Sequence, residues 1–229
     1  MISVGILDTK GYEVCRNFES FLPPKECARL EKIKNKKACA QSFFSRLLLS
    51  KMYEDKFQES LPEISYTNSG KPYFDKLSRY FSVSHDKDVV VVALSDEENL
   101  GIDVQSFDGS EYMMKRIEKR FLSKIPLECK EKNNREVEFL FFELSGKSER
   151  FEIKSSKCEL FTKEKENVLN RQTKDFLLRW TCLEASLKLS GLGFKQFGNV
   201  NESLQKEEFK TCFFQHGGIC FALSLAFSK

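Results

Sequence analysis

The sequence lacks several features that would point to common classes of protein. None of its eight cysteines forms a Cys-x-x-Cys pair, and no apolar run approaches membrane-spanning length. Neither sign of charge dominates, because 37 basic residues are offset by 34 acidic ones. Residues 1–8 lack the basic flank and the long apolar stretch of a signal peptide. We therefore expect a soluble, cytoplasmic protein with no membrane partner.

The near balance of charge also bears on nucleic-acid binding. Lys32, Lys34, Lys36 and Lys37 form a local basic run, but such a run is usually the solvated face of a helix. A net charge of only +3 does not favour a nucleic-acid-binding protein. The same lysines suit a phosphate-bearing ligand or an acidic protein partner, so we expect no nucleic-acid partner.

The cysteines do not predict a zinc site. The only spacing of interest is Cys212, His216 and Cys220, which lie in residues 209–221. That segment predicts a hairpin turning at Gly217-Gly218, with His216 in the turn and the two cysteines packed in strands. Unpaired cysteines in apolar surroundings are typical of a reducing compartment.

An apolar stripe at helical spacing predicts a helix late in the chain. Its members are Phe176, Leu177, Trp180, Leu183 and Leu187. Glu184 falls inside this stripe, because at about 100° per residue it projects about 40° from Trp180. A buried carboxylate costs several kcal/mol unless it is compensated, so Lys188, a metal ion or both are expected as partners. The alternative is an ordinary surface pair between Glu184 and Lys188.

A second acidic position follows a predicted strand. Residues 88–94, Asp-Val-Val-Val-Val-Ala-Leu, are typical of a buried central strand. In the returning strand, Ile102 and Val104 should point to one face, and Asp103 and Gln105 to the other. With Glu184, these two side chains would form an oxygen-only site that suits magnesium. The alternative is that they are simply the solvent face of an edge strand.

Four motifs in a fixed order make the chain recognisable. They are Gly70-Lys71-Pro72, Phe81-Ser82-Val83-Ser84-His85, residues 101–105, and residues 180–188 followed by Gly191-Leu192-Gly193. In this order and at this spacing, the chain resembles the larger, pseudo-dimeric class of 4'-phosphopantetheinyl transferases. The resemblance covers about residues 25–123 and 158–227. Each motif alone is weak, and their shared order is what is specific.

The chain departs from the family pattern at three positions. Gln105 stands where the family usually has a second carboxylate, so the site loses one negative charge and should bind magnesium more weakly. Leu183 replaces a lysine that normally precedes the glutamate, which removes a cation near the phosphates. Ser82 replaces an asparagine, a milder change because a hydroxyl can also hold a neighbouring backbone group.

The resemblance implies the reaction. Such enzymes move the phosphopantetheine arm of coenzyme A onto a serine of an apo carrier protein and release adenosine 3',5'-bisphosphate. It implies that Asp103, Glu184 and Gln105 hold Mg²⁺, and that Lys188 stabilises charge on the bridging or leaving oxygen. Glu184, directly or through water, would take the proton from the carrier serine.

The resemblance also assigns the nucleotide contacts. It implies that Lys37 and His85 meet the 3'-phosphate of coenzyme A, and that Lys71 and the neighbourhood of Ser84 line the adenosine pocket. Arg46 matches an arginine of the family, which either touches ligand or supports the fold. Without the motif, His85 would be an ordinary capped or solvent-facing ring.

The expected fold class is α/β (α+β), with two similar halves related by a pseudo-twofold axis and a ligand cleft between them. This arrangement is implied by the resemblance. The halves would be residues 1–106, which anchor the nucleotide, and residues 107–229, which carry the metal-binding and catalytic helix. Residues 124–157 have no family counterpart and predict an inserted hairpin around Ser145-Gly146-Lys147-Ser148. The insertion either helps to select a carrier protein or has no role.

Two rival functions remain open. A catalytically silent relative would bind coenzyme A as a sensor or scaffold. In that case, Gln105 and Leu183 would be signs of lost catalytic activity. A nucleic-acid-binding protein would use the lysine-rich helix. The expected carrier protein is of the fatty-acid, polyketide, peptide-synthetase or lysine-pathway type, and the expected state is a monomer. Manganese could replace magnesium, because both ions accept oxygen ligands.

Overall fold

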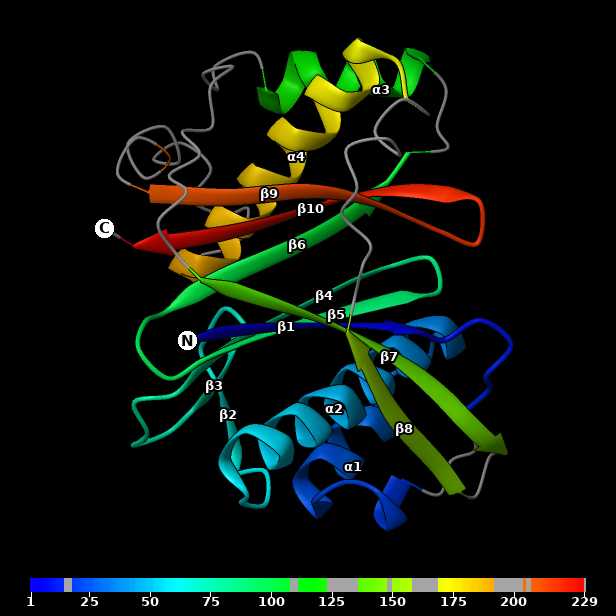
Figure 1. Ribbon diagram of the computed structural model, residues 1–229, viewed down its shortest axis with the longest axis vertical. Helices are drawn as coiled ribbons and strands as arrows, with labels where there is room; N and C mark the ends of the chain where they lie inside the picture. The colour runs from blue at the N-terminus through cyan, green and yellow to red at the C-terminus, as the bar shows by residue number, and fades with distance from the viewer. Residues whose placement is uncertain are drawn as a thin grey trace.

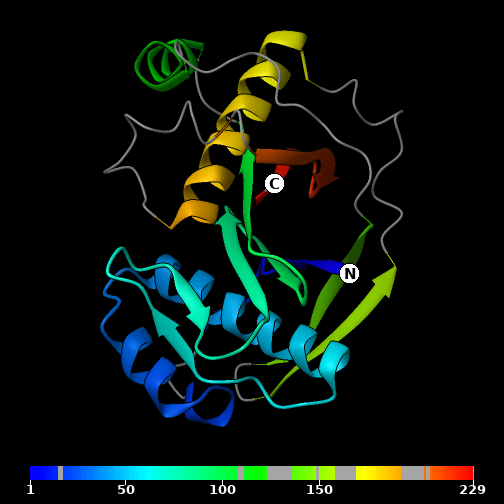
Figure 2. The ribbon, with the colours of Figure 1, turned by 90° about the vertical axis from the view of Figure 1, so that its left-hand side faces the viewer.

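The computed structural model describes residues 1–14, 18–107, 111–122, 136–147, 150–157, 169–191, 204 and 207–228. In this part of the chain, four layers are stacked in the order helix, sheet, sheet, helix (Figures 1 and 2). The mixed α/β class expected from the sequence is confirmed. The pseudo-twofold relation between two halves stays a prediction.

The larger sheet has five strands and is built around the first strand of the chain. Its order is β4 (Tyr80–Asp86), β5 (Val89–Ser95), β1 (Ile2–Asp8), β7 (Val137–Lys147) and β8 (Arg150–Lys157). All of β5 is buried, as its β-branched run predicts. Strands β7 and β8 pair antiparallel, so a hairpin is present, but the predicted turn is misplaced, because residues 145–147 belong to β7 and pair with β8 up to Lys147 opposite Arg150. This hairpin extends the larger sheet, because β7 pairs parallel with β1.

The smaller sheet has three strands. Its order is β6 (Leu100–Ser106), β10 (Ile219–Ser228) and β9 (Glu207–His216). The predicted turn at Gly217-Gly218 is confirmed, and both glycines have positive φ angles, 55° and 78°. His216, which was expected in the turn, is instead the last residue of β9 and pairs with Ile219. The side chain of His216 pairs with Asp8 at 2.7 Å across the two sheets.

Sheet membership does not follow the expected division at residue 106. Strand β6 precedes that point but pairs with β10 near the end of the chain, whereas β7 and β8 follow it and join the sheet of β1. The reason is that pairing satisfies buried strand edges wherever a partner is in register, regardless of position in the chain. The expected roles of the two segments stay a prediction.

The two sheets pack face to face through apolar side chains. Ile6, Val91 and Ala93 of the larger sheet meet Ile102, Val104 and further residues of the smaller one. This contact uses every second residue of β6, because side chains alternate along a strand. Asp103 therefore points away from the core between the sheets, as the sequence predicts.

Each sheet is covered on its outer face by a long helix. Helix α2 (Lys36–Phe57) packs on the larger sheet together with α1 (Pro24–Glu31), and it begins where Asn35 accepts the amide of Ala38. The short strands β2 (Ile64–Tyr66) and β3 (Pro72–Phe74) form a separate hairpin. A 3-10 turn at Phe18–Ser20 precedes α1.

Helix α4 (Arg171–Ser190) covers the smaller sheet. It begins where Asn170 accepts the amide of Thr173 over 2.8 Å, and it ends at Gly191, whose φ of 69° is left-handed. Helix α3 (Glu111–Ile117) continues into a π-helical turn at Glu118–Leu122 and packs beside it. In the described residues, no helix is both long enough and apolar enough to cross a membrane.

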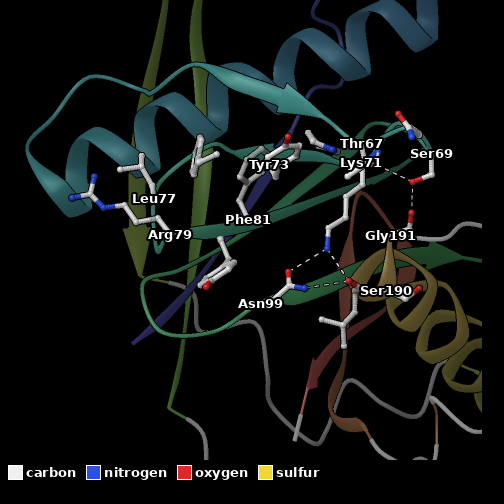
Figure 3. Close-up of a pocket in the computed structure, with 15 residues that line it drawn as sticks. Thr67, Ser69, Lys71, Tyr73, Leu77, Arg79, Phe81, Asn99, Ser190 and Gly191 are labelled. Atoms are coloured by element: carbon white, nitrogen blue, oxygen red, sulfur yellow. Dashed lines mark hydrogen bonds between the residues drawn. The ribbon is translucent and has the colours of Figure 1, made fainter.

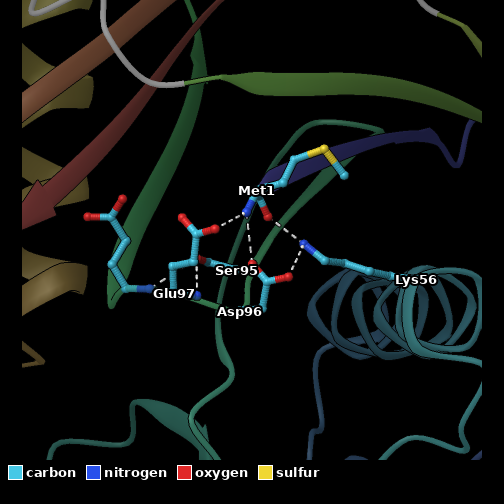
Figure 4. A network of polar contacts seen from close by, with 6 residues as sticks. Met1, Lys56, Ser95, Asp96 and Glu97 are labelled. Atoms are coloured by element: carbon cyan, nitrogen blue, oxygen red, sulfur yellow. Dashed lines mark hydrogen bonds and ion pairs between the residues drawn. The ribbon is translucent and has the colours of Figure 1, made fainter.

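The turn between β5 and β6 is stabilised by ion pairs with the N-terminus and with α2 (Figure 4). The amino group of Met1 contacts Asp96 at 2.9 Å and Glu97 at 2.8 Å, and Lys56 of α2 lies 3.4 Å from Asp96. The hydroxyl of Ser95 accepts the amides of Glu97 and Glu98. These contacts hold the start of β6 beside the larger sheet.

Candidate active site

The candidate site lies where β4 and β6, the neighbouring edge strands of the two sheets, are joined by side chains. The acceptors are Ser82, Ser84 and Asp86 of β4, and the donors are the backbone amides of Ile102, Val104 and Ser106. The three distances are 3.1, 3.3 and 2.7 Å. Alternate residues share one face of a strand, so this spacing aligns the strands like a ladder. Ser82 thus holds a backbone group, as expected for a replacement of asparagine.

The ladder places Ser84 beside Asp103. The Ser84 hydroxyl donates to Oδ1 of Asp103 over 2.8 Å, and Lys188 Nζ donates to both atoms over 2.7 Å. Asp103 is 95% buried, since its exposed fraction is 5%. Its second oxygen, Oδ2, is buried and has no hydrogen-bond partner among the described residues. A buried carboxylate oxygen without a partner is costly and fits a site that is completed by a ligand.

Glu184 of α4 faces the same centre. It is half-buried, and burial, followed by the nearby charge of Asp103, raises the pKa of its carboxyl to about 7 despite the opposing effect of Lys188. The surface pair between Glu184 and Lys188 is not among the ion pairs of the described residues. Lys188 turns instead to Asp103, because that carboxylate is more deeply buried and gains more from a cation.

Gly101 explains how α4 comes close enough to bring these groups together. A Cβ atom at this position would lie 2.0 Å from the carbonyl oxygen of Ala185 and 2.6 Å from the amide nitrogen of Leu189. Both contacts are with helix backbone, so no side chain can move to make room. The glycine of the Gly-x-Asp motif is thus required by the packing of α4 on β6 at the two residues that directly follow Glu184 and Lys188.

The other two departures from the family pattern, Gln105 and Leu183, differ in whether they face the candidate site. Gln105 is half-buried on the same face of β6 as Asp103, and its Nε2 donates to the carbonyl of Ser106 over 3.1 Å. Its Oε1 is the atom that could face a cation. Leu183 is fully buried in an apolar cluster with Leu122 and Leu187. Its side chain packs in the core of the C-terminal layer rather than in the cluster of charged groups.

Lys71 lines a cavity of about 680 Å³ beside the end of α4 (Figure 3). Its Nζ donates to the carbonyl of Leu189 over 2.8 Å and to Asn99 over 3.2 Å. Burial lowers the pKa of this ammonium group to about 8. The turn before Lys71 is held to α4 by a hydrogen bond from Ser69 to the carbonyl of Gly191.

Several residues of this cavity were not predicted from the sequence. Tyr73, Arg79 and Asn99 line it together with the last residues of α4. The only available signals were the position of Asn99 two residues before Gly101 and the helix-ending Gly191, which follows Lys188 closely. Neither signal indicates a cavity without the tertiary contact between α4 and residues 67–71.

His85 and Lys37 lie toward the other end of β4. His85 is an exposed residue next to Ser84, yet the protein around its ring desolvates it, and this effect together with the charge of Lys188 lowers its pKa. Lys37 is exposed in the first turn of α2 and lines a second cavity, of about 480 Å³, with Lys34 and Lys87. Lys37 and Lys71 therefore line different cavities, near opposite ends of β4.

The side chain of Arg46 makes buried contacts with other residues of the protein. It is 97% buried, since its exposed fraction is 3%, and its Nε donates to the buried carboxylate of Glu26 over 2.8 Å. Its Nη2 reaches the hydroxyl of Tyr66 at 3.1 Å, and that hydroxyl also donates to Glu26. Of the two roles that the sequence left open, these contacts favour support of the fold.

The oxygen atoms of the site are of the kind that bind a hard divalent cation. Two carboxylates, Asp103 and Glu184, converge from a strand and a helix, and one buried oxygen lacks a partner. In the part of the chain that the structure describes, no group of three or more His, Cys, Asp or Glu side chains could hold a metal ion. A cation here would need the Gln105 amide, water or ligand oxygens to complete its coordination.

No family model matches the chain, and no curated protein matches it. The resemblance therefore rests on the four motifs in the sequence.

Proposed function

We propose that the protein is a magnesium-dependent 4'-phosphopantetheinyl transferase that acts on apo carrier proteins. The observation that supports this best is the meeting of three elements at one point. Ser84 comes from β4, Asp103 from β6, and Lys188 and Glu184 from α4. These residues come from three of the four motifs, which lie far apart in the sequence.

The proposed reaction forms one phosphorus–oxygen bond and breaks another. The serine oxygen of the carrier attacks the phosphorus that bears pantetheine, and the bond to adenosine 3',5'-bisphosphate breaks. Glu184 receives the serine proton, directly or through water. Without a metal ion the pKa of this carboxyl is about 7, and a bound divalent ion would lower it and favour the carboxylate form that can accept a proton.

Asp103, Glu184 and Gln105 would hold the magnesium ion in this proposal. When bound, the ion would neutralise the diphosphate and polarise the phosphorus under attack. Lys188 would stabilise the negative charge that develops on the bridging or leaving oxygen. Its ammonium group already lies beside Asp103 on a flexible stem.

Coenzyme A would lie along the junction of β4, β6 and α4. The cavity of about 680 Å³ beside Lys71 is large enough for a nucleoside, and its lining combines aromatic rings with the Lys71 ammonium group. The contacts of His85 and Lys37 with the 3'-phosphate that the resemblance implies do not fit this placement, because both residues lie toward the opposite end of β4 from the cavity. The arrangement of one helix on the outer face of each sheet supports the proposed pseudo-twofold relation.

A second candidate function is coenzyme A binding without transfer. It is favoured by Gln105, because the amide supplies one negative charge less than the carboxylate usual in the family. Leu183 weighs less, since it packs in an apolar cluster. The two candidates make different predictions for the carrier protein.

The test is a transfer assay read by mass spectrometry. Apo carrier proteins of the four types are incubated with coenzyme A, Mg²⁺ and the protein, and one carrier should gain the mass of one phosphopantetheine group. A chelator or Asp103→Asn should reduce the rate at least about a hundredfold. The matched control Asp75→Asn changes an exposed carboxylate outside the site and should retain the wild-type rate.

Two outcomes would count against the proposal. Coenzyme A binding without a mass gain on any carrier would favour the silent function. Absence of both binding and transfer would reject both candidates.

A further inference from the structure

The contact between Lys188 and Asp103 has a consequence for ligand binding. Lys188 Nζ lies 2.7 Å from Oδ1 of Asp103, the residue proposed to hold the metal ion. The aspartate side chain is only 7% exposed, whereas that of Lys188 is 30% exposed. The ammonium group thus compensates the buried charge from the solvent side of the site.

This contact and a divalent ion compete for the same carboxylate, because Lys188 holds Oδ1 of Asp103 and an ion on the unpartnered Oδ2 would lie close to the ammonium group. A carboxylate oxygen that already accepts a short, charge-assisted hydrogen bond is a poorer ligand, and a positive ammonium group at this distance repels a second cation. Lys188 can move, because it lies in the last turn of α4 on a flexible stem. Ser84 keeps its own hydrogen bond to Asp103 when the ammonium group leaves, so the carboxylate stays oriented.

We propose that Lys188 is the counter-ion of Asp103 in the ligand-free protein and moves to the diphosphate when coenzyme A binds. The metal ion and coenzyme A therefore bind cooperatively, because each favours the state in which Lys188 has left Asp103. This inference rests on the proposed function for the identity of the diphosphate ligand. It adds that Lys188 couples the two binding events.

The test measures metal binding, not activity. Mn²⁺, which accepts the same oxygen ligands as Mg²⁺, is titrated into the protein, and the free ion is measured by electron paramagnetic resonance. Lys188→Met should raise the Mn²⁺ affinity of the ligand-free protein on the order of tenfold. Coenzyme A should raise the Mn²⁺ affinity of the wild type more than that of Lys188→Met. Lys188→Arg retains the positive charge and should bind Mn²⁺ like the wild type.

The outcomes separate this inference from the proposed function. If Lys188→Met binds Mn²⁺ no more tightly than the wild type, the counter-ion role is wrong while the metal site stands. If neither protein binds Mn²⁺, with or without coenzyme A, the metal site and the proposed function both fail. Asp103→Asn should abolish binding in either background, and retained binding would place the metal elsewhere.

A second measurement covers the case in which Lys188→Met does not fold. In the wild type labelled with ¹⁵N-lysine, the Lys188 ammonium resonance is assigned by its absence from Lys188→Arg. Mg²⁺ together with coenzyme A should shift this resonance, because its partner changes from Asp103 to phosphate. An unchanged resonance at saturating ligand would overturn the inference.

Discussion

The Ser84 hydroxyl donates a 2.8 Å hydrogen bond to Oδ1 of Asp103, although the two residues belong to different sheets. The same hydroxyl accepts the amide of Val104 and the ammonium group of Lys188. One donor and two acceptor positions are all that a serine hydroxyl has, so this side chain is saturated. Ser84 therefore links both sheets and α4 at the candidate site.

The first prediction concerns the ladder between β4 and β6. Ser82→Ala removes the acceptor of the Ile102 amide and leaves a buried donor without a partner. We expect the free energy of unfolding to fall by about 1–3 kcal/mol, measured by chemical denaturation. Ser82→Thr keeps the hydroxyl and should retain most of the stability. Equal losses in both variants would mean that packing, not this hydrogen bond, is responsible.

The second prediction concerns the close approach of α4 to β6. Gly101→Ala places a methyl group against the backbone of Ala185 and Leu189, so α4 must shift. We expect a loss of about 3 kcal/mol in the free energy of unfolding, together with weaker metal binding. In the control Gly11→Ala, only the positive φ of 80° is strained, and the cost should be about 1 kcal/mol. A melting temperature of Gly101→Ala at or above that of the control would contradict the packing argument.

The third prediction concerns the pH dependence of stability. The carboxyl of Glu184 has a pKa of about 7 in the folded protein, above the ordinary value of 4.5 for a glutamate side chain. Between these two values the folded state binds more protons than the unfolded state, so stability decreases as pH rises. Relative to Glu184→Gln, the wild type should lose on the order of 2 kcal/mol between pH 4.5 and pH 8 without divalent ions. Parallel stability curves for the two proteins would show that Glu184 is not desolvated.

The fourth prediction separates the two roles considered for Arg46. Arg46→Met leaves the buried carboxylate of Glu26 without its cation and should cost about 3–5 kcal/mol. The double variant Glu26→Gln with Arg46→Met removes both charges and should recover much of this loss. Its coenzyme A affinity, measured by calorimetry, should stay within a few-fold of the wild type. A stable double variant that no longer binds coenzyme A would instead assign Arg46 to the ligand.

Local patterns predicted much of the secondary structure around the site. The alternation in β6 correctly separated Asp103 from Ile102 and Val104, and the apolar run of β5 was correctly identified as a buried strand. The Gly217-Gly218 pair correctly located a hairpin. Such features are decided by backbone geometry over a few residues, so they can be inferred without knowing the fold.

Several features of the site depended on contacts between distant segments. The sequence offered Glu184 as the partner of Lys188, whereas the folded chain places Asp103 there. It grouped Lys37 and Lys71 around one nucleotide, whereas they line separate cavities. It left the role of Arg46 open, and the position of Glu26 now favours a structural one. In each case the outcome depends on which distant segments the fold brings together, and that is a property of the whole chain.

The sequence by itself determined which residues could carry the chemistry: two carboxylates, an amide, and a lysine one helical turn after Glu184. Their motifs and alternation follow from side-chain chemistry and local backbone geometry. Only the tertiary structure decided that β6 leaves the larger sheet to pair with β10, and that α4 approaches it at Gly101. These long-range contacts bring Asp103, Ser84 and Lys188 together, because each sheet must bury its apolar face and pair its exposed edges.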